Sequence, residues 1–205
     1  MEKAEQLRAA GRQAPGDAEV QYELGNARYD RGQYEEAIVL FEHALEEAPR
    51  SDETKPFDRA WLVRAKYELA FCSFRLAEQG DAALYAKTEN ILQVIDLQAK
   101  GLTIREEIID LWGHLLVKQG RYAEASLKFE ELIESFPQSR LVENAWYMLG
   151  GLYFKMDCPE KGRKAFEQLV FNFPNPAYAI GNDSNADQDT DKGGDENVLL
   201  YDYNR

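Results

Sequence analysis

The sequence predicts an all-helical protein built from stacked helix pairs. Three observations predict this fold class. Residues 18–51, 106–139 and 143–176 carry small, apolar and proline residues at matching offsets. The apolar positions of these segments follow the spacing of one helix face. A proline stands after the second helical stretch of each segment, where it ends the helix. Because one helix pair cannot bury its apolar face alone, the pairs must stack on one another.

The segment 143–176 shows the pattern most completely. Trp146, Leu149 and Tyr153 lie at i, i+3 and i+7, which is one face of a helix. Gly150 is small at a place where the two helices of a pair come close together. We therefore expect Trp146 to be a core anchor between the helices of this pair.

The two earlier segments share these offsets with fewer aromatic residues. Trp112-Gly113 and Leu24-Gly25 occupy the place of Leu149-Gly150. The second helices align on a phenylalanine and end before a proline; these residues are Phe41, Phe129 and Phe166, followed by Pro49, Pro137 and Pro174. Because the three segments place the same kinds of residue at the same relative positions, we predict three helix pairs of one kind.

The order Trp-x2-Leu-Gly-x2-Tyr at 146–153, with Phe166 and Pro174 beyond it, resembles the tetratricopeptide repeat. The resemblance implies a right-handed α-α superhelix, or solenoid. It also implies that the first helices of successive pairs line a concave groove that binds segments of partner proteins. The predicted array covers 1–176, with a half repeat at 2–15, repeats at 18–51, 106–139 and 143–176, and a degenerate repeat at 57–98.

The degenerate repeat and the tail depart from the pattern. Residues after Pro56 read as one long amphipathic helix, followed by a second helix after an extended turn. Residues 177–205 hold seven acidic and two basic residues, a net charge of −5. The polar composition of 181–196 predicts disorder, although the closing stretch NVLLYDYNR is apolar again.

Composition excludes several classes of partner. The net charge is −13, which disfavours nucleic acid and anionic membrane surfaces, since both are bound through Lys and Arg. The longest apolar runs are too short to span a membrane. The N-terminus lacks an apolar signal region, which favours a cytoplasmic protein; removal of a signal would instead indicate a periplasmic one.

Motifs of catalysis and cofactor binding are missing from the sequence, so we expect a protein that is not an enzyme and takes no cofactor. His43 and His114 belong to different repeats. Asp187, Asp189 and Asp191 alternate as calcium ligands do, but the required glycine and the final carboxylate are not in register. We expect a solvated acidic linker there and no metal site.

The resemblance places the partner-binding residues on the first helices. The predicted set is rich in aromatic and charged side chains, as protein-binding surfaces are: Tyr22, Asn26, Tyr29, Arg64, Tyr67, Phe71, Phe74, Arg75, His114, Lys118, Tyr147, Phe154 and Lys155. Tyr67, Phe71 and Phe74 share one helix face, which we interpret as a spare apolar face flanked by two arginines. It would favour an apolar segment carrying one or two acidic residues.

Two functions remain open at this point. The first is a scaffold or adaptor that binds a protein or peptide segment in its groove. The second is a structural subunit of a larger assembly. The Phe-Pro repeat endings at 136–137 and 173–174 resemble bacterial envelope tetratricopeptide proteins. Tyr22, Glu68 and Glu107 stand where a chaperone-tail clamp would need Lys or Asn, so that subgroup is disfavoured.

Overall fold

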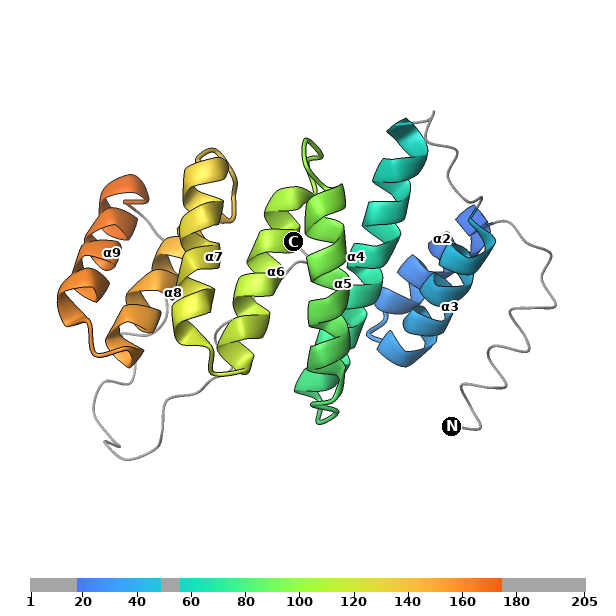
Figure 1. The fold of residues 1–205 in the computed structure, drawn as a ribbon, viewed down its shortest axis with the longest axis horizontal. Coiled ribbons are helices and arrows are strands. Elements are labelled where there is room, and N and C mark those ends of the chain that lie inside the picture. The colour runs from blue at the N-terminus through green and yellow to red at the C-terminus, as the bar shows by residue number, and fades with distance from the viewer. Residues whose placement is uncertain (1–17, 49–55, 175–205) are drawn as a thin grey trace. The chain divides into compact units, whose positions relative to one another are not determined.

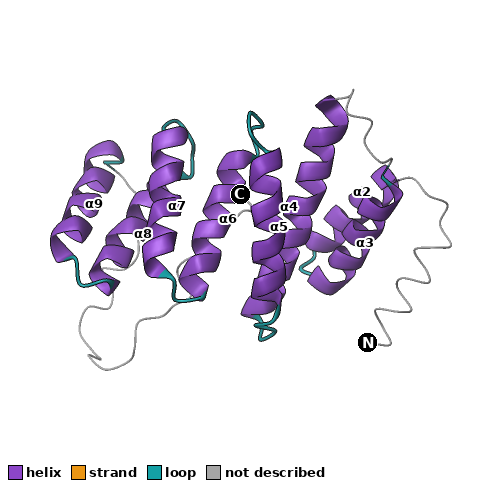
Figure 2. Cartoon of the chain, viewed as in Figure 1, coloured by secondary structure: helices purple, strands orange, loops and turns teal. Residues whose placement is uncertain are grey.

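The computed structural model describes residues 18–48 and 56–174, and every regular element in these ranges is an α-helix (Figures 1 and 2). The helices are α2 (Ala18–Tyr29), α3 (Tyr34–Glu47), α4 (Pro56–Glu78), α5 (Leu84–Gln98), α6 (Arg105–Lys118), α7 (Tyr122–Ser135), α8 (Val142–Lys155) and α9 (Pro159–Asn172). The predicted all-helical class is confirmed. The half repeat at 2–15 and the tail at 177–205 lie outside the described residues, so both stay predictions.

The chain divides into two compact units, with the boundary between Leu115 and Leu116 inside α6. In the first unit, α2 packs on α3, α3 on α4, and α4 on α5. In the second unit, α7 packs on α8 and α8 on α9. In both units the helices packed in this way are consecutive in the chain, as stacked pairs require. Figure 1 shows α5 in front of α4, and α9 beside α8.

The turns inside three helix pairs share one conformation. Gly32 and Gly120 have φ angles of 70° and 73°, and Asp157 takes the same place with φ of 57°. In each turn, this residue and the one after it donate their N–H groups to carbonyls at the end of the preceding helix. In the first turn, Gly32 N–H donates to the Tyr29 carbonyl and Gln33 N–H donates to the Arg28 carbonyl. Glycine suits this left-handed position, and an aspartate tolerates it better than most residues. The breaks between these paired helices therefore fall at residues 30–33, 119–121 and 156–158.

Prolines mark one start and two ends among the second helices. Pro159 stands at the start of α9, where its missing N–H costs nothing. The last residues of α7 and α9, Ser135 and Asn172, come two residues before Pro137 and Pro174. Prolines thus follow the ends of α7 and α9, and a proline also opens α9.

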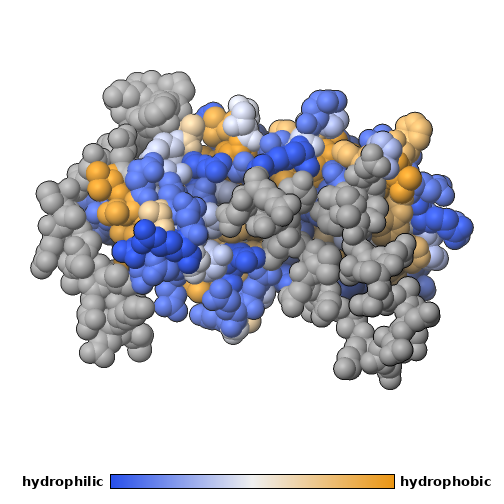
Figure 3. Space-filling view, turned by 180° about the vertical axis from the view of Figure 1, so that it is seen from behind, coloured by the Kyte–Doolittle hydropathy of each residue, from blue (hydrophilic) through white to orange (hydrophobic). Residues whose placement is uncertain are grey.

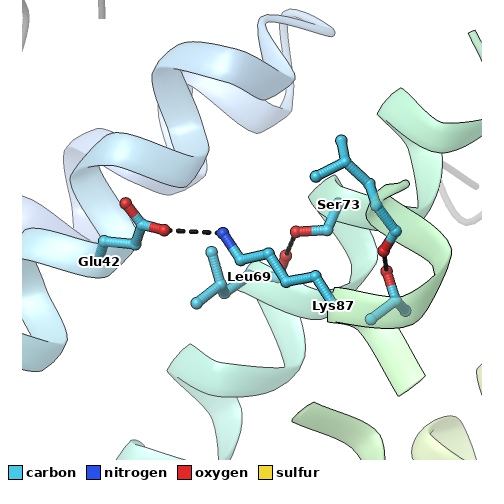
Figure 4. Close-up of polar contacts among 6 residues, drawn as sticks. Glu42, Leu69, Ser73 and Lys87 are labelled. Carbon is cyan, nitrogen blue, oxygen red and sulfur yellow. Dashed lines mark hydrogen bonds and ion pairs between the residues drawn. The ribbon is translucent and has the colours of Figure 1, made fainter. Parts of the chain in front are cut away.

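One core cluster of the first unit lies between α3 and α4. Ala37 and Phe41 of α3 pack with Leu69 and Cys72 of α4, and all four are buried. Ser73 is also buried, and its hydroxyl donates to the Leu69 carbonyl at 2.8 Å, so no polar group is left unpaired there (Figure 4). At the surface, Lys87 of α5 reaches Glu42 of α3 at 2.8 Å (Figure 4).

Candidate partner-binding surfaces

The most concentrated polar cluster of the first unit is centred on Arg64 of α4. Its Nε lies 2.8 Å from Glu68 one turn later, and its other guanidinium nitrogen lies 2.8 Å from Glu107 of α6. The guanidinium also lies over the Tyr67 ring, 5.7 Å from its centroid. One arginine therefore links two first helices of the array and holds two carboxylates at once.

Tyr22 of α2 lies beside this cluster. Its ring packs against Phe41 and Trp61, with centroids 5.7 and 5.5 Å apart. Burial raises the pKa of the Tyr22 phenol, and hydrogen bonds with Asn26 and Arg64 oppose that rise. The half-buried phenol thus belongs to the same polar surface as Arg64.

The cluster carries more negative than positive charge. Burial raises the pKa of Glu68, Arg64 opposes the rise, and Glu107 and Asp30 add to it. Glu68 is only 8% exposed, so its charge is poorly solvated. Arg64 offsets one of the two carboxylates that it holds, which leaves the surface net acidic.

A second group lies further along the same helices. Tyr29 meets the edge of Phe71 at 5.6 Å and lies 6.0 Å from Tyr34. Arg75 lies over the Tyr34 ring at 5.8 Å and pairs with Glu78 at 3.2 Å. Tyr29, Arg75 and Asn26 are half-buried, so each keeps part of its side chain accessible.

Four predicted partner-binding residues are buried, and their assignment as accessible side chains is wrong. Tyr67, Phe71 and Phe74 are 3%, 4% and 0% exposed, and His114 is 3% exposed. Residues 67–74 of α4 are buried without interruption, because neighbouring elements cover this helix on all sides. The aromatic face that the sequence suggested was spare packs inside the protein, with Phe74 against Tyr85 of α5.

The predicted residues of the second unit remain accessible. Phe154 is 49% exposed and stacks on Phe166, with centroids 6.1 Å apart. Tyr147 meets the edge of the same Phe166 ring at 6.0 Å. Lys155 lies over the Tyr122 ring at 5.3 Å, and Lys118 is half-buried. Figure 3 shows apolar side chains exposed over α8 and α9.

Sequence reasoning missed a cavity in the second unit. It has a volume of about 450 Å³ and lies among α7, α8 and α9, with Trp146, Leu149 and Ile133 in its wall. Trp146 is half-buried, so part of the indole faces open space, and its role as a core anchor stays a prediction. The face formed by Trp146, Leu149 and Tyr153 was visible in the sequence, but the space beside it was not.

Within the described ranges, no group of three or more His, Cys, Asp or Glu side chains could hold a metal ion. None of the described helices is long and apolar enough to cross a membrane.

The packing of successive helices as pairs defines an array of the tetratricopeptide kind. Residues 18–51 match a family model described as tetratricopeptide repeat, and residues 111–175 match a second model with the same description. The two matched segments therefore carry tetratricopeptide repeats.

Solved structures share this fold. YrrB, described as a TPR protein with an unusual peptide-binding site, aligns over 85% of this chain and 80% of its own, with a TM-score of 0.60 and 19% identity. MamA AMB-1 aligns over 87% of each chain, with a TM-score of 0.59 and 17% identity. At these identities the likeness supports the fold alone.

A curated relative matches part of the sequence. The transcription activator GutR of Bacillus subtilis (strain 168) is 32% identical over 89 residues. The match covers 42% of this chain and 11% of GutR, so this chain spans only about a tenth of that relative.

Proposed function

We propose that this protein is an adaptor that holds a segment of a partner protein against the first helices of its first unit. Tetratricopeptide repeats imply protein–protein interaction, and YrrB, which shares the fold, is described as having a peptide-binding site. The accessible residues of the proposed surface are Tyr22, Asn26, Tyr29, Arg64 and Arg75. In the second unit, we propose Lys118, Tyr147, Phe154 and Lys155 as partner-binding residues in their own right.

One observation carries the proposal: Arg64 is held between Glu68 and Glu107 and is bordered by the half-buried Tyr22. Half-buried tyrosines bind partners well, because they offer apolar area and a polar tip at a low cost in entropy. Carboxylates beside aromatic rings favour a cation, through charge and through the ring face.

The charge of the partner follows from the same contacts. Arg64 is already paired with two carboxylates and Arg75 with Glu78, so neither offers an unpaired cation to an acidic segment. Asp30, Glu68 and Glu107 leave the surface net acidic. We therefore replace the acidic partner expected from the sequence with an apolar segment that carries at least one Lys or Arg.

Replacing single carboxylates tests the proposal. Glu107→Gln and Asp30→Asn keep the side-chain shape and remove one charge each from the proposed surface. Glu46→Gln, at an exposed position near the end of the second helix α3, removes one charge elsewhere and is the matched control. Partners recovered from cells by the wild-type protein should fall in amount with the first two variants and stay constant with the control. Equal recovery with all three variants would exclude this surface.

A structural subunit remains the second candidate, and exposed apolar side chains favour it. Val170 and Phe171 at the end of α9 are 61% and 82% exposed. Large apolar residues that lie side by side in the open indicate a surface that another protein covers. A permanent subunit would be recovered in fixed proportion with its neighbours and would aggregate without them.

A further inference from the structure

The cavity of the second unit is built as a receptor for an apolar side chain. Trp146 and Leu149 of α8 meet Ile133 of α7 and Ala165 of α9 around a space of about 450 Å³. That volume lies within the range of ordinary ligand pockets. Leu149 and Ala165 are buried, whereas Trp146 and Ile133 are only half-buried. The exposed part of the indole and the Ile133 side chain is therefore available to a guest.

Internal contacts tie together one group of residues in the cavity wall. The Tyr153 hydroxyl donates to Glu130 of α7, and Lys161 of α9 lies over the Tyr153 ring at 5.3 Å. The hydrogen bond with Glu130 and burial together raise the pKa of Tyr153 to about 12, with burial the larger cause. These three polar groups satisfy one another, so a guest has to be recognised by other residues.

Glu167 of α9 is an exposed carboxylate of the cavity wall, and two further charges of opposite sign lie at the rim. Glu134 belongs to α7 and Lys164 to α9, and both are exposed. Among the residues that the structure describes, none of these three makes an ion pair or a side-chain hydrogen bond. The α7 wall thus presents one unpaired anion, Glu134, and the α9 wall presents one unpaired cation, Lys164, and a second unpaired anion, Glu167, around an apolar floor.

We propose that this cavity binds a short amphipathic helix of a partner protein, in trans. A large apolar side chain of the helix enters the cavity against Trp146. A basic residue on one flank pairs with Glu134, and an acidic residue on the other flank pairs with Lys164. This surface shares no residue with the proposed surface of the first unit, and its occupant carries both charges rather than a basic one.

A designed peptide supplies the probe. An alanine-based helix of about 14 residues carries leucines at i, i+4 and i+7, lysines on one flank and glutamates on the other. Calorimetry on the full chain should detect binding, and replacing the central leucine with serine should weaken it about tenfold or more. Glu134→Gln and Lys164→Gln should each weaken it two- to fivefold, roughly the effect of an exposed ion pair. Arg163→Gln, beside Lys164 on α9 but outside the cavity wall, should leave it unchanged.

A blocking variant completes the test. Ile133→Trp places an indole in the cavity and should abolish binding without lowering the melting temperature. Glu107→Gln of the first unit should bind the peptide as the wild type does, which separates this inference from the proposed function. No binding by the wild type, or binding that is insensitive to Glu134→Gln and Lys164→Gln, would overturn the proposal. Binding that appears only after Leu199→Ser and Leu200→Ser would also overturn it, because the chain's own segment would then be the occupant.

Discussion

The Phe166 ring of α9 lies directly against Gly150 of α8. A Cβ atom placed on Gly150 would fall 2.5 Å from two carbons of that ring. The ring cannot move aside easily, because Tyr147 meets its edge and Phe154 stacks on it. The helices of this pair therefore depend on a residue without a side chain at position 150.

Gly150→Ala should lower the free energy of unfolding by about 1–3 kcal/mol, as overpacking does. The next residue provides a matched control, since a Cβ on Gly151 meets nothing within 4 Å. Gly151→Ala should raise stability by about 0.5–1 kcal/mol, because alanine favours the helix. Urea denaturation of both variants measures the two effects. If both changes stabilise, the close approach of Phe166 to α8 is wrong.

Phe74 provides a test of the buried face of α4. The side chain is 0% exposed, so Phe74→Ala should cost about 3–5 kcal/mol. Leu97→Ala on α5, which is 68% exposed, should cost no more than about 0.5 kcal/mol. Denaturant midpoints of the two variants give the comparison. If the Phe74 variant is as stable as the Leu97 variant, the face formed by Tyr67, Phe71 and Phe74 is not buried in the core and becomes a candidate binding surface again.

Glu68 makes stability depend on pH. Burial raises its pKa, so the folded protein binds this proton up to a higher pH than the unfolded chain does. The free energy of unfolding must then fall as pH rises from the ordinary carboxyl range through the raised pKa. Glu68→Gln removes this component, so the melting temperature of the variant relative to wild type should increase between about pH 4 and pH 7. If the melting temperature of the variant instead falls relative to wild type toward pH 7, then Arg64 stabilises the ionised form of Glu68 by more than burial disfavours it.

The two cysteines should differ in reactivity. Cys72 is 0% exposed, and burial, together with the charge of Glu68, raises the pKa of its thiol well above the usual range. Cys158 is half-buried at the start of α9. Iodoacetamide should therefore modify Cys158 in the native protein and reach Cys72 only in denaturant, which peptide mass spectrometry can resolve. Equal labelling of the two in the native state would mean that the core between α3 and α4 opens readily.

The helices could be predicted from the sequence because their signals are local. The glycines at 32 and 120 and the prolines at 137, 159 and 174 act on their own backbone, and the helices begin and end beside them. The apolar spacing of Trp146, Leu149 and Tyr153 likewise depends on one helix only. Local chemistry was enough to predict this part of the fold.

The site could be predicted only in part, because exposure depends on neighbours. Tyr67, Phe71 and Phe74 have the spacing of a binding face, but the same spacing is found in a helix that is covered on every side. The pairing of Arg64 with Glu107 joins residues 43 positions apart, and no local pattern indicates it. The cavity beside Trp146 depends on space that side chains of three helices leave unfilled, which a sequence pattern does not contain.

Site-specific photo-crosslinking tests the central claim most directly. A benzophenone side chain at Asn26 would lie beside Tyr22 on the proposed surface of the first unit. The matched control replaces another asparagine, the exposed Asn90 on the second helix α5. We predict that illumination in cells crosslinks the Asn26 variant to a partner through a segment that contains Lys or Arg, and that the Asn90 variant gives no such product. Crosslinks from Asn90 with none from Asn26 would contradict the account.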